Sequence, residues 1–253
     1  MNSDSLEKIA IVTGGGRGIG AAIARALAGD GYAVAVNYAN DRQSAESVVA
    51  EIHQRGHRAI AVQADVGRES DVMRMFSAVD AEFGRPAVLV NNGGVTGGFS
   101  RVDSVSAEVL ESVFRVNVVG AFLCSREAIR RMSTKHGGRG GVIVNISSRA
   151  AQLGGAGEWV HYAATKGALD TLTVGLAKEV ALEGVRVNAV AAGLVDTELH
   201  AAAGDPRRPE RMAASVPMGR AGLPEEIAQS VRWLASAEAS YVTGTILAAA
   251  GGR

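Results

Sequence analysis

Tyr162 and Lys166 stand four residues apart in the run His-Tyr-Ala-Ala-Thr-Lys-Gly. In a helix, this spacing places the phenol and the ammonium on one face, one turn apart. A nearby ammonium favours the phenolate and therefore lowers a phenol pKa that is otherwise about 10. A phenol tuned in this way can exchange a proton with a substrate hydroxyl or carbonyl oxygen near neutral pH. The same spacing is common in surface contacts, so the pair alone does not establish catalysis.

A glycine-rich run, Thr13-Gly14-Gly15-Gly16-Arg17-Gly18-Ile19-Gly20, follows the short apolar segment 8–12 and precedes a helical pattern at 21–28. A strand, a glycine turn and a helix start together suit a dinucleotide pyrophosphate. The glycines let the backbone approach the phosphates, and the helix N-terminus attracts the anion. A tight turn without a ligand is the alternative, but the surrounding strand and helix favour the cofactor.

Apolar segments and helical patterns alternate along the chain, and they must position these residues. The predicted strands are 8–12, 32–38, 59–65, 87–91, 141–147, 185–191 and 245–249. The predicted helices are 21–28, 43–55, 69–83, 107–135, 161–183 and 224–235. The strands are near-continuous apolar runs, which is typical of parallel strands covered on both faces. We therefore predict an α/β fold, a doubly wound parallel sheet of about seven strands (a Rossmann fold), in a single domain spanning 1–253.

Polar and glycine residues stand at the carboxyl ends of six predicted strands, the edge where such sheets bind their ligands. They are the glycine run, Asn37, Asp65-Val66, Asn91 to Gly94, Ser147-Ser148 and Ala192-Gly193. Turns attract such residues anyway, but six coincidences indicate a site at this edge.

Composition limits the alternatives. The 253 residues are 47% hydrophobic and carry 26 basic and 26 acidic side chains, so one large core is feasible and nucleic acid is not an expected partner. Residues 1–8 lack a signal-peptide pattern, and no apolar run has membrane-spanning length, so we expect a cytoplasmic protein without a membrane partner. The single cysteine, Cys124, excludes an intrachain disulfide and a cysteine-based metal cluster, and we predict no metal site.

The chain resembles the short-chain dehydrogenase/reductase family over essentially its whole length. The resemblance rests on Thr-Gly-x-x-x-Gly-x-Gly at 13–20, Asn-Asn-Gly-Gly at 91–94, Tyr-x-x-x-Lys at 162–166 and Asn-x-x-x-x-Gly at 188–193. It implies an active site made of Asn117, Ser148, Tyr162 and Lys166.

The resemblance also implies a role for each residue. Tyr162 is the general acid for reduction and the base for oxidation, while Lys166 holds the nicotinamide ribose and biases Tyr162 toward phenolate. Ser148 hydrogen-bonds the substrate oxygen, where negative charge builds, and it fits the family spacing better than Ser147. Asn117 anchors a water chain from Lys166 to solvent. Without the resemblance, Asn117 would read as a solvated helix residue.

Cofactor contacts follow from the same resemblance. They are Gly14, Gly16, Arg17, Gly18, Ile19, Gly20, Asn37, Asp65, Val66, Asn91, Gly93, Tyr162, Lys166, Gly193, Val195 and Thr197. An acidic residue at the end of the second strand would bind the ribose 2′-OH and repel a 2′-phosphate. This chain has Asn37 there, and Arg17 and Arg42 could reach a phosphate or be solvated. We therefore favour NADP(H) over NAD(H).

Three departures from the family pattern concern loops near the cofactor. Gly93 replaces the usual Ala, Ala192 replaces the usual Pro, and the run 248–252 lacks the usual Asp. An additional glycine costs about 0.5–1 kcal/mol of conformational entropy on ordering, and losing the proline frees a φ angle. We expect looser loops and unchanged chemistry.

The predicted function is an NADP(H)-dependent oxidoreductase that transfers a hydride between nicotinamide and a small-molecule carbonyl or secondary alcohol. The alternatives are an NAD-dependent sugar or polyol dehydrogenase and a non-catalytic dinucleotide-binding sensor. A substrate lid is expected at about 198–217, where Arg207, Arg208 and Arg211 either attract an acidic substrate or are solvated.

Other residues bear on the substrate and the assembly. Glu158 and Trp159 could line a pocket for polyols or sugars, or Trp159 could pack at a subunit face. The resemblance implies a homo-oligomer, most often a tetramer. Small and apolar residues of helices 107–135 and 161–183 suit pairing with a second copy, or they cover the chain's own sheet.

Overall fold

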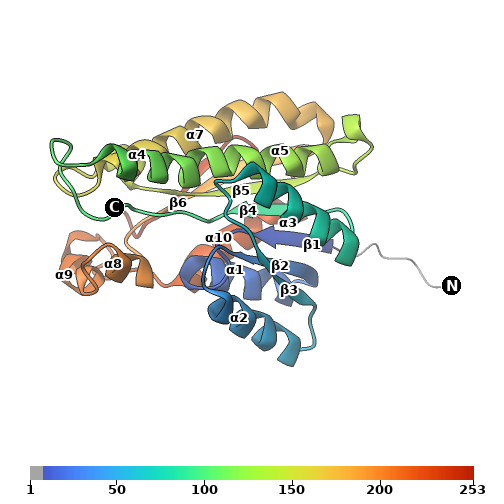
Figure 1. Ribbon diagram of the computed structural model, residues 1–253, viewed down its shortest axis with the longest axis horizontal. Helices are drawn as coiled ribbons and strands as arrows, with labels where there is room; N and C mark the ends of the chain where they lie inside the picture. The colour runs from blue at the N-terminus through green and yellow to red at the C-terminus, as the bar shows by residue number, and fades with distance from the viewer. Residues whose placement is uncertain (1–7) are drawn as a thin grey trace.

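Seven parallel strands form the centre of the computed structural model, which describes residues 8–253 (Figure 1). Residues 1–7, which make up most of the segment that lacks a signal-peptide pattern, lie outside the described residues. The strands are β1 (Lys8–Val12), β2 (Tyr32–Tyr38), β3 (Ala59–Gln63), β4 (Val88–Asn91), β5 (Gly141–Ser148), β6 (Val185–Ala192) and β7 (Ile246–Ala249). Their order in the sheet is β3-β2-β1-β4-β5-β6-β7. The predicted fold is confirmed, with strand ends shifted by one or two residues.

Helices cover both faces of the sheet (Figure 1). One layer holds α1 (Gly18–Gly29), α2 (Arg42–Gln54) and α10 (Pro224–Ala235), and the other holds α3 (Glu69–Glu82), α4 (Ala107–Phe114), α5 (Gly120–Met132) and α7 (Val160–Val180). Each layer has its own apolar core, with Ile23 and Val231 in one and Phe76 and Met132 in the other. The strand order reverses between β1 and β4, which places the switch point of the sheet between their carboxyl ends.

Shorter elements lie between these. They are α6 (Ala150–Leu153), α8 (Glu198–Ala202), α9 (Arg208–Met212) and the 3-10 turns Thr134–His136, Ala181–Glu183, Ala213–Ser215 and Ala237–Ala239. In Figure 1, α8 and α9 lie at the end of the molecule toward which the β1 arrow points, the carboxyl edge of the sheet. None of the helices within 8–253 combines the length and the apolarity needed to cross a membrane.

The prediction of one continuous helix at 107–135 is wrong. The segment is α4, a π-helical turn at Arg115–Val119, and then α5. A π turn accommodates one additional residue in a helix and occurs frequently at functional sites. Its backbone stays helical, and nothing in the residue types marks a break between α4 and α5. The turn contains Asn117, whose side chain it directs into the protein.

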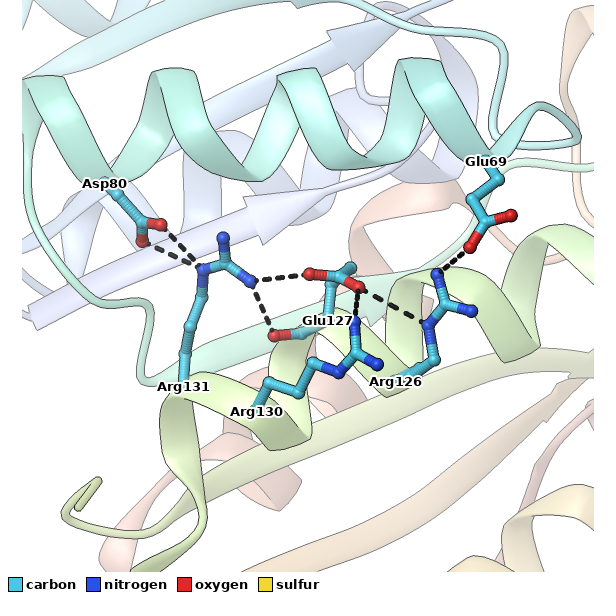
Figure 2. A network of polar contacts seen from close by, with 6 residues as sticks. All are labelled: Glu69, Asp80, Arg126, Glu127, Arg130 and Arg131. Atoms are coloured by element: carbon cyan, nitrogen blue, oxygen red, sulfur yellow. Dashed lines mark hydrogen bonds and ion pairs between the residues drawn. The ribbon is translucent and has the colours of Figure 1, made fainter. Parts of the chain in front are cut away.

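Ion pairs fix α5 against α3 (Figure 2). The buried carboxylate of Glu127 accepts hydrogen bonds from Arg130 at 2.8 Å and from Arg131 at 2.9 Å. The Arg131 guanidinium also donates to Asp80 on α3, at 2.8 Å. At the other end, Arg126 bridges Glu127 and Glu69. This network sets the position of α5, and with it the position of the π turn.

Only part of the predicted pairing surface is free to meet a second copy. Ala121, Leu169 and Leu176 are buried within the chain's own fold, as expected if these helices cover the chain's own sheet. Phe122 is about half exposed, with a relative accessibility of 53%, and Val119 is similarly exposed at 46%.

Candidate active site

Ser148, the last residue of β5, lies beside Tyr162 in the first turn of α7, close enough for its hydroxyl to lower the pKa of the phenol. The neighbouring hydroxyl, that of Ser147, donates instead to the carboxylate of Asp170 at 2.5 Å. Successive residues of a strand point to opposite faces, so only one of the two serines can face Tyr162. The geometry selects Ser148, the serine chosen from the sequence.

Lys166 lies one turn after Tyr162 on the same helix, and it is buried. Its Nζ is 5.5 Å from the centroid of the Tyr162 ring and donates to the carbonyl of Ile146 at 2.7 Å. Burial lowers the pKa of Lys166 to about 8, against the opposing charge of Asp170. The amine therefore remains largely protonated at neutral pH.

The direction predicted for the Tyr162 pKa is wrong for this site. Burial raises the pKa of Tyr162 to about 12, and the nearby Ser148 hydroxyl lowers it by less. Desolvation of the phenolate thus has a larger effect than the spacing to Lys166 implied. At neutral pH the phenol carries its proton, which suits a group that donates a proton.

Asn117 is 3% exposed, so the reading of a solvated helix face is wrong. Its Oδ1 accepts from the backbone N–H of Val95 at 2.8 Å, and its Nδ2 donates to the carbonyl of Val95 at 2.9 Å. The same Nδ2 donates to the hydroxyl of Thr165, between Tyr162 and Lys166 in sequence. Asn117 therefore joins the loop after β4 to the helix that carries the catalytic pair.

The glycine run after β1 forms a tight turn that leads directly into α1. Gly14 and Gly18 have φ angles of +59° and +50°, which favour glycine. At Gly20, a Cβ would lie 2.2 Å from the carbonyl oxygen of Gly14, so the helix could not pack against the turn with any larger residue. The N-cap residue, Arg17, makes no side-chain capping bond. These features fit a pyrophosphate at the helix N-terminus.

A cleft of about 510 Å³ opens beside this turn. Gly16, Arg17 and Gly18 line one side of it, and Thr197 lines another. A Cβ at Gly18 would lie 3.3 Å from the methyl group of Thr197, so the start of the predicted lid lies directly over the glycine turn. The structure thus brings together two predicted cofactor segments that are far apart in sequence.

Asn92 and Thr13, which are not among the predicted site residues, hold the glycine turn in place. Nδ2 of Asn92 donates to the carbonyls of Thr13 and Gly14, at 2.9 and 3.0 Å. In return, the hydroxyl of Thr13 accepts from the backbone N–H groups of Asn92 and Gly93. Both residues belong to motifs quoted above, but their pairing spans about eighty residues and has no local sequence signal.

Two predicted cofactor residues direct their side chains into the protein. The amide of Asn37 accepts from Gly14 N and donates to backbone carbonyls, including that of Ala64 at 3.0 Å. Asn91 Nδ2 donates to Ser125 and Asn145. Any contact of Asn91 with a ribose would come from its backbone, and the Asn37 amide has no free donor for a phosphate.

Asp65 and Val66, two further predicted cofactor contacts, also have partners or neighbours within the protein. The carboxylate of Asp65 accepts from Arg115 at 2.7 Å and from the backbone N–H of Gly67 at 2.9 Å. Val66 lines a cavity of about 10 Å³, the size of one water molecule. Asn91, Gly93 and Asn117 line the same cavity, so four predicted site residues meet there.

The loop after β6 is closely packed. A Cβ at Gly193 would lie 2.6 Å from the Cα of Ala250, so glycine is required by the approach of the C-terminal segment. Ala192, which replaces the usual proline, is paired with Ala249 of β7 in the sheet. A Cβ at Gly93 would lie 3.3 Å from the Thr13 hydroxyl, so alanine would fit there only after a small shift.

The lid arginines differ in their surroundings. Arg207 and Arg211 are exposed, and Arg211 pairs with Asp205 at 2.6 Å. Arg208 is only 4% exposed, and it pairs with Glu158 at 2.7 Å. The expectation of solvated lid arginines is therefore wrong for Arg208.

Comparison with known proteins agrees with this geometry. A family model described as Enoyl-(Acyl carrier protein) reductase matches residues 14–253. The chain is 50% identical to an uncharacterized oxidoreductase, YgfF, of Escherichia coli K12, over 97% of this chain and 99% of that protein. It is 38% identical to the 3-oxoacyl-[acyl-carrier-protein] reductase FabG of Staphylococcus aureus strain Mu50, over 98% of both chains.

Comparison with solved structures also finds dehydrogenases/reductases. A dehydrogenase/reductase from Sinorhizobium meliloti 1021 superposes with a TM-score of 0.89 at 35% identity, over 97% of this chain and 94% of that one. A short-chain dehydrogenase/reductase from Serratia marcescens BCRC 10948 gives the same TM-score and identity over 98% of both chains. The chain belongs to the short-chain dehydrogenase/reductase family of NAD(P)-dependent oxidoreductases.

Proposed function

We propose that the protein is an NADP(H)-dependent oxidoreductase that interconverts a carbonyl compound and a secondary alcohol. The observation that carries this proposal is the grouping of Ser148, Tyr162 and Lys166 at the carboxyl edge of the sheet. The reaction requires a proton donor, a hydrogen-bond donor to the substrate oxygen and a nearby positive charge, and these three side chains supply them.

The bound nicotinamide supplies or accepts the hydride. In reduction, the Tyr162 hydroxyl gives its proton to the substrate oxygen, while Ser148 hydrogen-bonds that oxygen as negative charge develops on it. The Lys166 ammonium stabilises the phenolate that remains. In oxidation, the same phenolate takes the proton back, so the reaction is favoured as the phenol pKa approaches the working pH.

The preference for NADP(H) rests mainly on Arg17. This arginine is exposed in the glycine turn and lines the cleft beside it. Arg42 is a weaker candidate for the 2′-phosphate because its guanidinium donates to Glu46 at 2.7 Å. No acidic side chain follows Asn37 until Asp41, whose carboxylate caps α2 through Ser44. An NAD-dependent sugar or polyol dehydrogenase remains the alternative enzyme, and a dinucleotide sensor the non-catalytic one.

A homo-oligomer, with the tetramer as the predicted form, is also proposed. The exposed apolar residues Val119 and Phe122, beside the π turn, support a contact with a second copy. Sedimentation of the purified protein tests the oligomeric state.

The first experiment is titration of the purified protein with NADPH and with NADH, read by the fluorescence of the bound nicotinamide. Tighter binding of NADPH than of NADH, reduced by Arg17→Ala and unaffected by Arg42→Ala, is the expected result. Tighter binding of NADH would contradict the cofactor preference and favour the polyol dehydrogenase.

A second experiment tests the chemistry. Tyr162→Phe should abolish NADPH-dependent reduction of ketones while NADPH still binds. Turnover by this variant at the rate of the natural protein would contradict the assigned proton donor. Binding of NADPH by the natural protein without turnover of any carbonyl compound would favour the sensor.

A further inference from the structure

The guanidinium of Arg208 lies in a cage formed by Phe99, Glu158 and Trp159. Its Nη1 and Nη2 donate to the two carboxylate oxygens of Glu158 at 2.8 and 2.7 Å. Its Cζ is 4.7 Å from the centroid of the Trp159 ring and 5.6 Å from that of Phe99. Two aromatic faces and a carboxylate are the groups that proteins use to bind an organic cation.

The walls of the cage also contact one another without Arg208. Phe99 stacks on Trp159 with ring centroids 4.9 Å apart, and the backbone N–H of Ser100 donates to the carbonyl of Glu158 at 2.7 Å. Gly155 has a φ of +62°, and a Cβ there would lie 2.6 Å from Cδ1 of the Trp159 indole. The loops that carry the cage are therefore shaped around the indole, and Ala203 of the lid packs on the same ring.

Arg208 matches this cage incompletely. Its side chain is 4% exposed, and its Nε has no hydrogen-bond partner among residues 8–253. A buried donor left without a partner destabilises the folded state, because its hydrogen bond to water is lost and not replaced. Glu158 accepts from both Nη groups, but the aromatic faces offer no acceptor to Nε, so an alkylated ammonium group with few N–H bonds or none would leave no donor unpaired in this cage.

The cage is also next to the catalytic phenol. The Trp159 ring that contacts the guanidinium lies 5.5 Å from the Tyr162 ring, centroid to centroid. One indole therefore touches both the buried cation and the proton donor. A cation bound in the cage and a carbonyl group held at Tyr162 would therefore contact the same indole.

We propose that Phe99, Glu158 and Trp159 form a subsite for a cationic substrate group, so that the preferred substrates are amino ketones and the corresponding amino alcohols. Arg208 occupies the subsite when no such substrate is present and leaves it as the lid moves. This inference rests on the proposed function, since it names the substrate class of the same site.

A matched pair of ketones tests the subsite. Phenacyltrimethylammonium carries a permanent charge, and 3,3-dimethyl-1-phenylbutan-1-one has the same shape without charge. With NADPH, kcat/KM for the cation should exceed that for the neutral ketone by about tenfold or more, given the strength of a desolvated cation–π contact. Equal values for the two ketones, or a preference for the neutral one, would overturn the proposal.

Variants then identify the residues responsible. Glu158→Gln should bring the ratio of the two kcat/KM values close to one, mainly by raising KM for the cation. Arg208→Met should lower KM for the cation, because the competing guanidinium is gone. Arg211→Met is the matched control, since Arg211 is an exposed lid arginine paired with Asp205. If Arg208→Met raised KM equally for both ketones, Arg208 would serve only to hold the lid in place, and the proposal would be wrong.

A binding measurement separates failure of this inference from failure of the proposed function. The chain has two tryptophans, so Trp233→Phe leaves Trp159 as the only indole. Tetramethylammonium should change the Trp159 emission saturably, while tert-butanol should not, and Glu158→Gln should weaken the effect. Saturable binding without turnover of either ketone would support the subsite and count against the oxidoreductase. Turnover without saturable binding would count against the subsite alone.

Discussion

Asn92 donates from its side-chain amide to the carbonyl of Gly14, and so ties the loop after β4 to the glycine turn after β1. These loops flank the point where the strand order reverses. A second bond from the same amide, to the carbonyl of Thr13, makes the tie rigid. The phosphate turn is therefore held from outside its own motif.

Asn92→Ala should weaken NADPH binding about tenfold, because two net hydrogen bonds of about 0.5–1.5 kcal/mol each are lost from the turn. Titration of the nicotinamide fluorescence measures the change. Asn40→Ala, at an exposed position, is the control and should bind NADPH normally. Unchanged affinity in Asn92→Ala would mean that the glycine turn keeps its shape alone.

Replacing the two adjacent serines should separate chemistry from stability. Ser148→Ala should lower kcat by about 10²–10³, the usual effect of removing one donor to a developing oxyanion. Ser147→Ala should leave kcat near that of the natural protein, because its hydroxyl faces Asp170. It should instead reduce the free energy of unfolding by about 1–3 kcal/mol, since Asp170 loses a partner. Steady-state kinetics and urea unfolding of both variants check this, and a reversed pattern would contradict the assignment.

Gly193→Ala should destabilise the protein by about 1–3 kcal/mol, because its Cβ overpacks the loop against the C-terminal segment. The Cα of Ala250 lies only 2.6 Å from the position of that Cβ. By contrast, nothing lies within 4 Å of a Cβ at Gly29, the last residue of α1. Gly29→Ala should therefore leave the stability unchanged or raise it by up to about 1 kcal/mol. Thermal melting of Gly193→Ala and Gly29→Ala tests whether the close approach of Ala250 determines the loss of stability.

Acid should remove the contribution of the Glu127 carboxylate to the free energy of unfolding. Burial alone would raise the pKa of this carboxyl, but Arg131, Arg130 and Arg126 together hold it below its ordinary value of 4.5 (Figure 2). A depressed folded-state pKa gives stability that is fully present above pH 4.5 and is lost as the pH falls through the folded-state value. Urea unfolding between pH 7 and pH 3 measures this loss.

Matched variants isolate the effect. Glu127→Gln should cost roughly 3 kcal/mol at neutral pH, since it removes the buried carboxylate charge that Arg126, Arg130 and Arg131 share. Its deficit relative to the natural protein should shrink below pH 4.5. Glu69→Gln, at the exposed end of the same network, should cost less than about 1 kcal/mol at any pH. A constant deficit for Glu127→Gln across this range would show that its charge does not matter.

The strands and their parallel type could be predicted because each is a near-continuous local apolar run. The placement of Tyr162 and Lys166 on one helix face could be predicted for a similar reason, since one helical turn relates them, whereas the catalytic roles were implied by the family resemblance. The inward orientation of the Asn37 and Asn91 side chains could not be predicted, because their amides form hydrogen bonds with partners that come near only in the folded sheet. The π turn also escaped prediction, since inserting one residue into a helix changes no propensity.

Arg208 illustrates another limit. In sequence it is one of three similar arginines in a polar segment, and nothing local separates it from Arg211. The difference arises from Glu158 and Trp159, about fifty residues earlier, which meet it in space. Burial of a charge depends on such distant partners, so composition alone assigns it to solvent.

The π turn also determines which insertions and deletions this chain can tolerate. The turn takes up its additional residue within the helix, so removing one residue from 115–119 would restore an ordinary helix and leave α5 in its present orientation relative to α4. Arg115, at the start of the turn, is bonded to Asp65, and Arg131, on α5, is bonded to Asp80. A residue deleted from α5 before Arg131 would instead rotate everything after it by about 100° relative to α4, so that shortened chain could keep only one of these ion pairs. A single-residue deletion that spares Asn117 should therefore be tolerated better in the π turn than in α5.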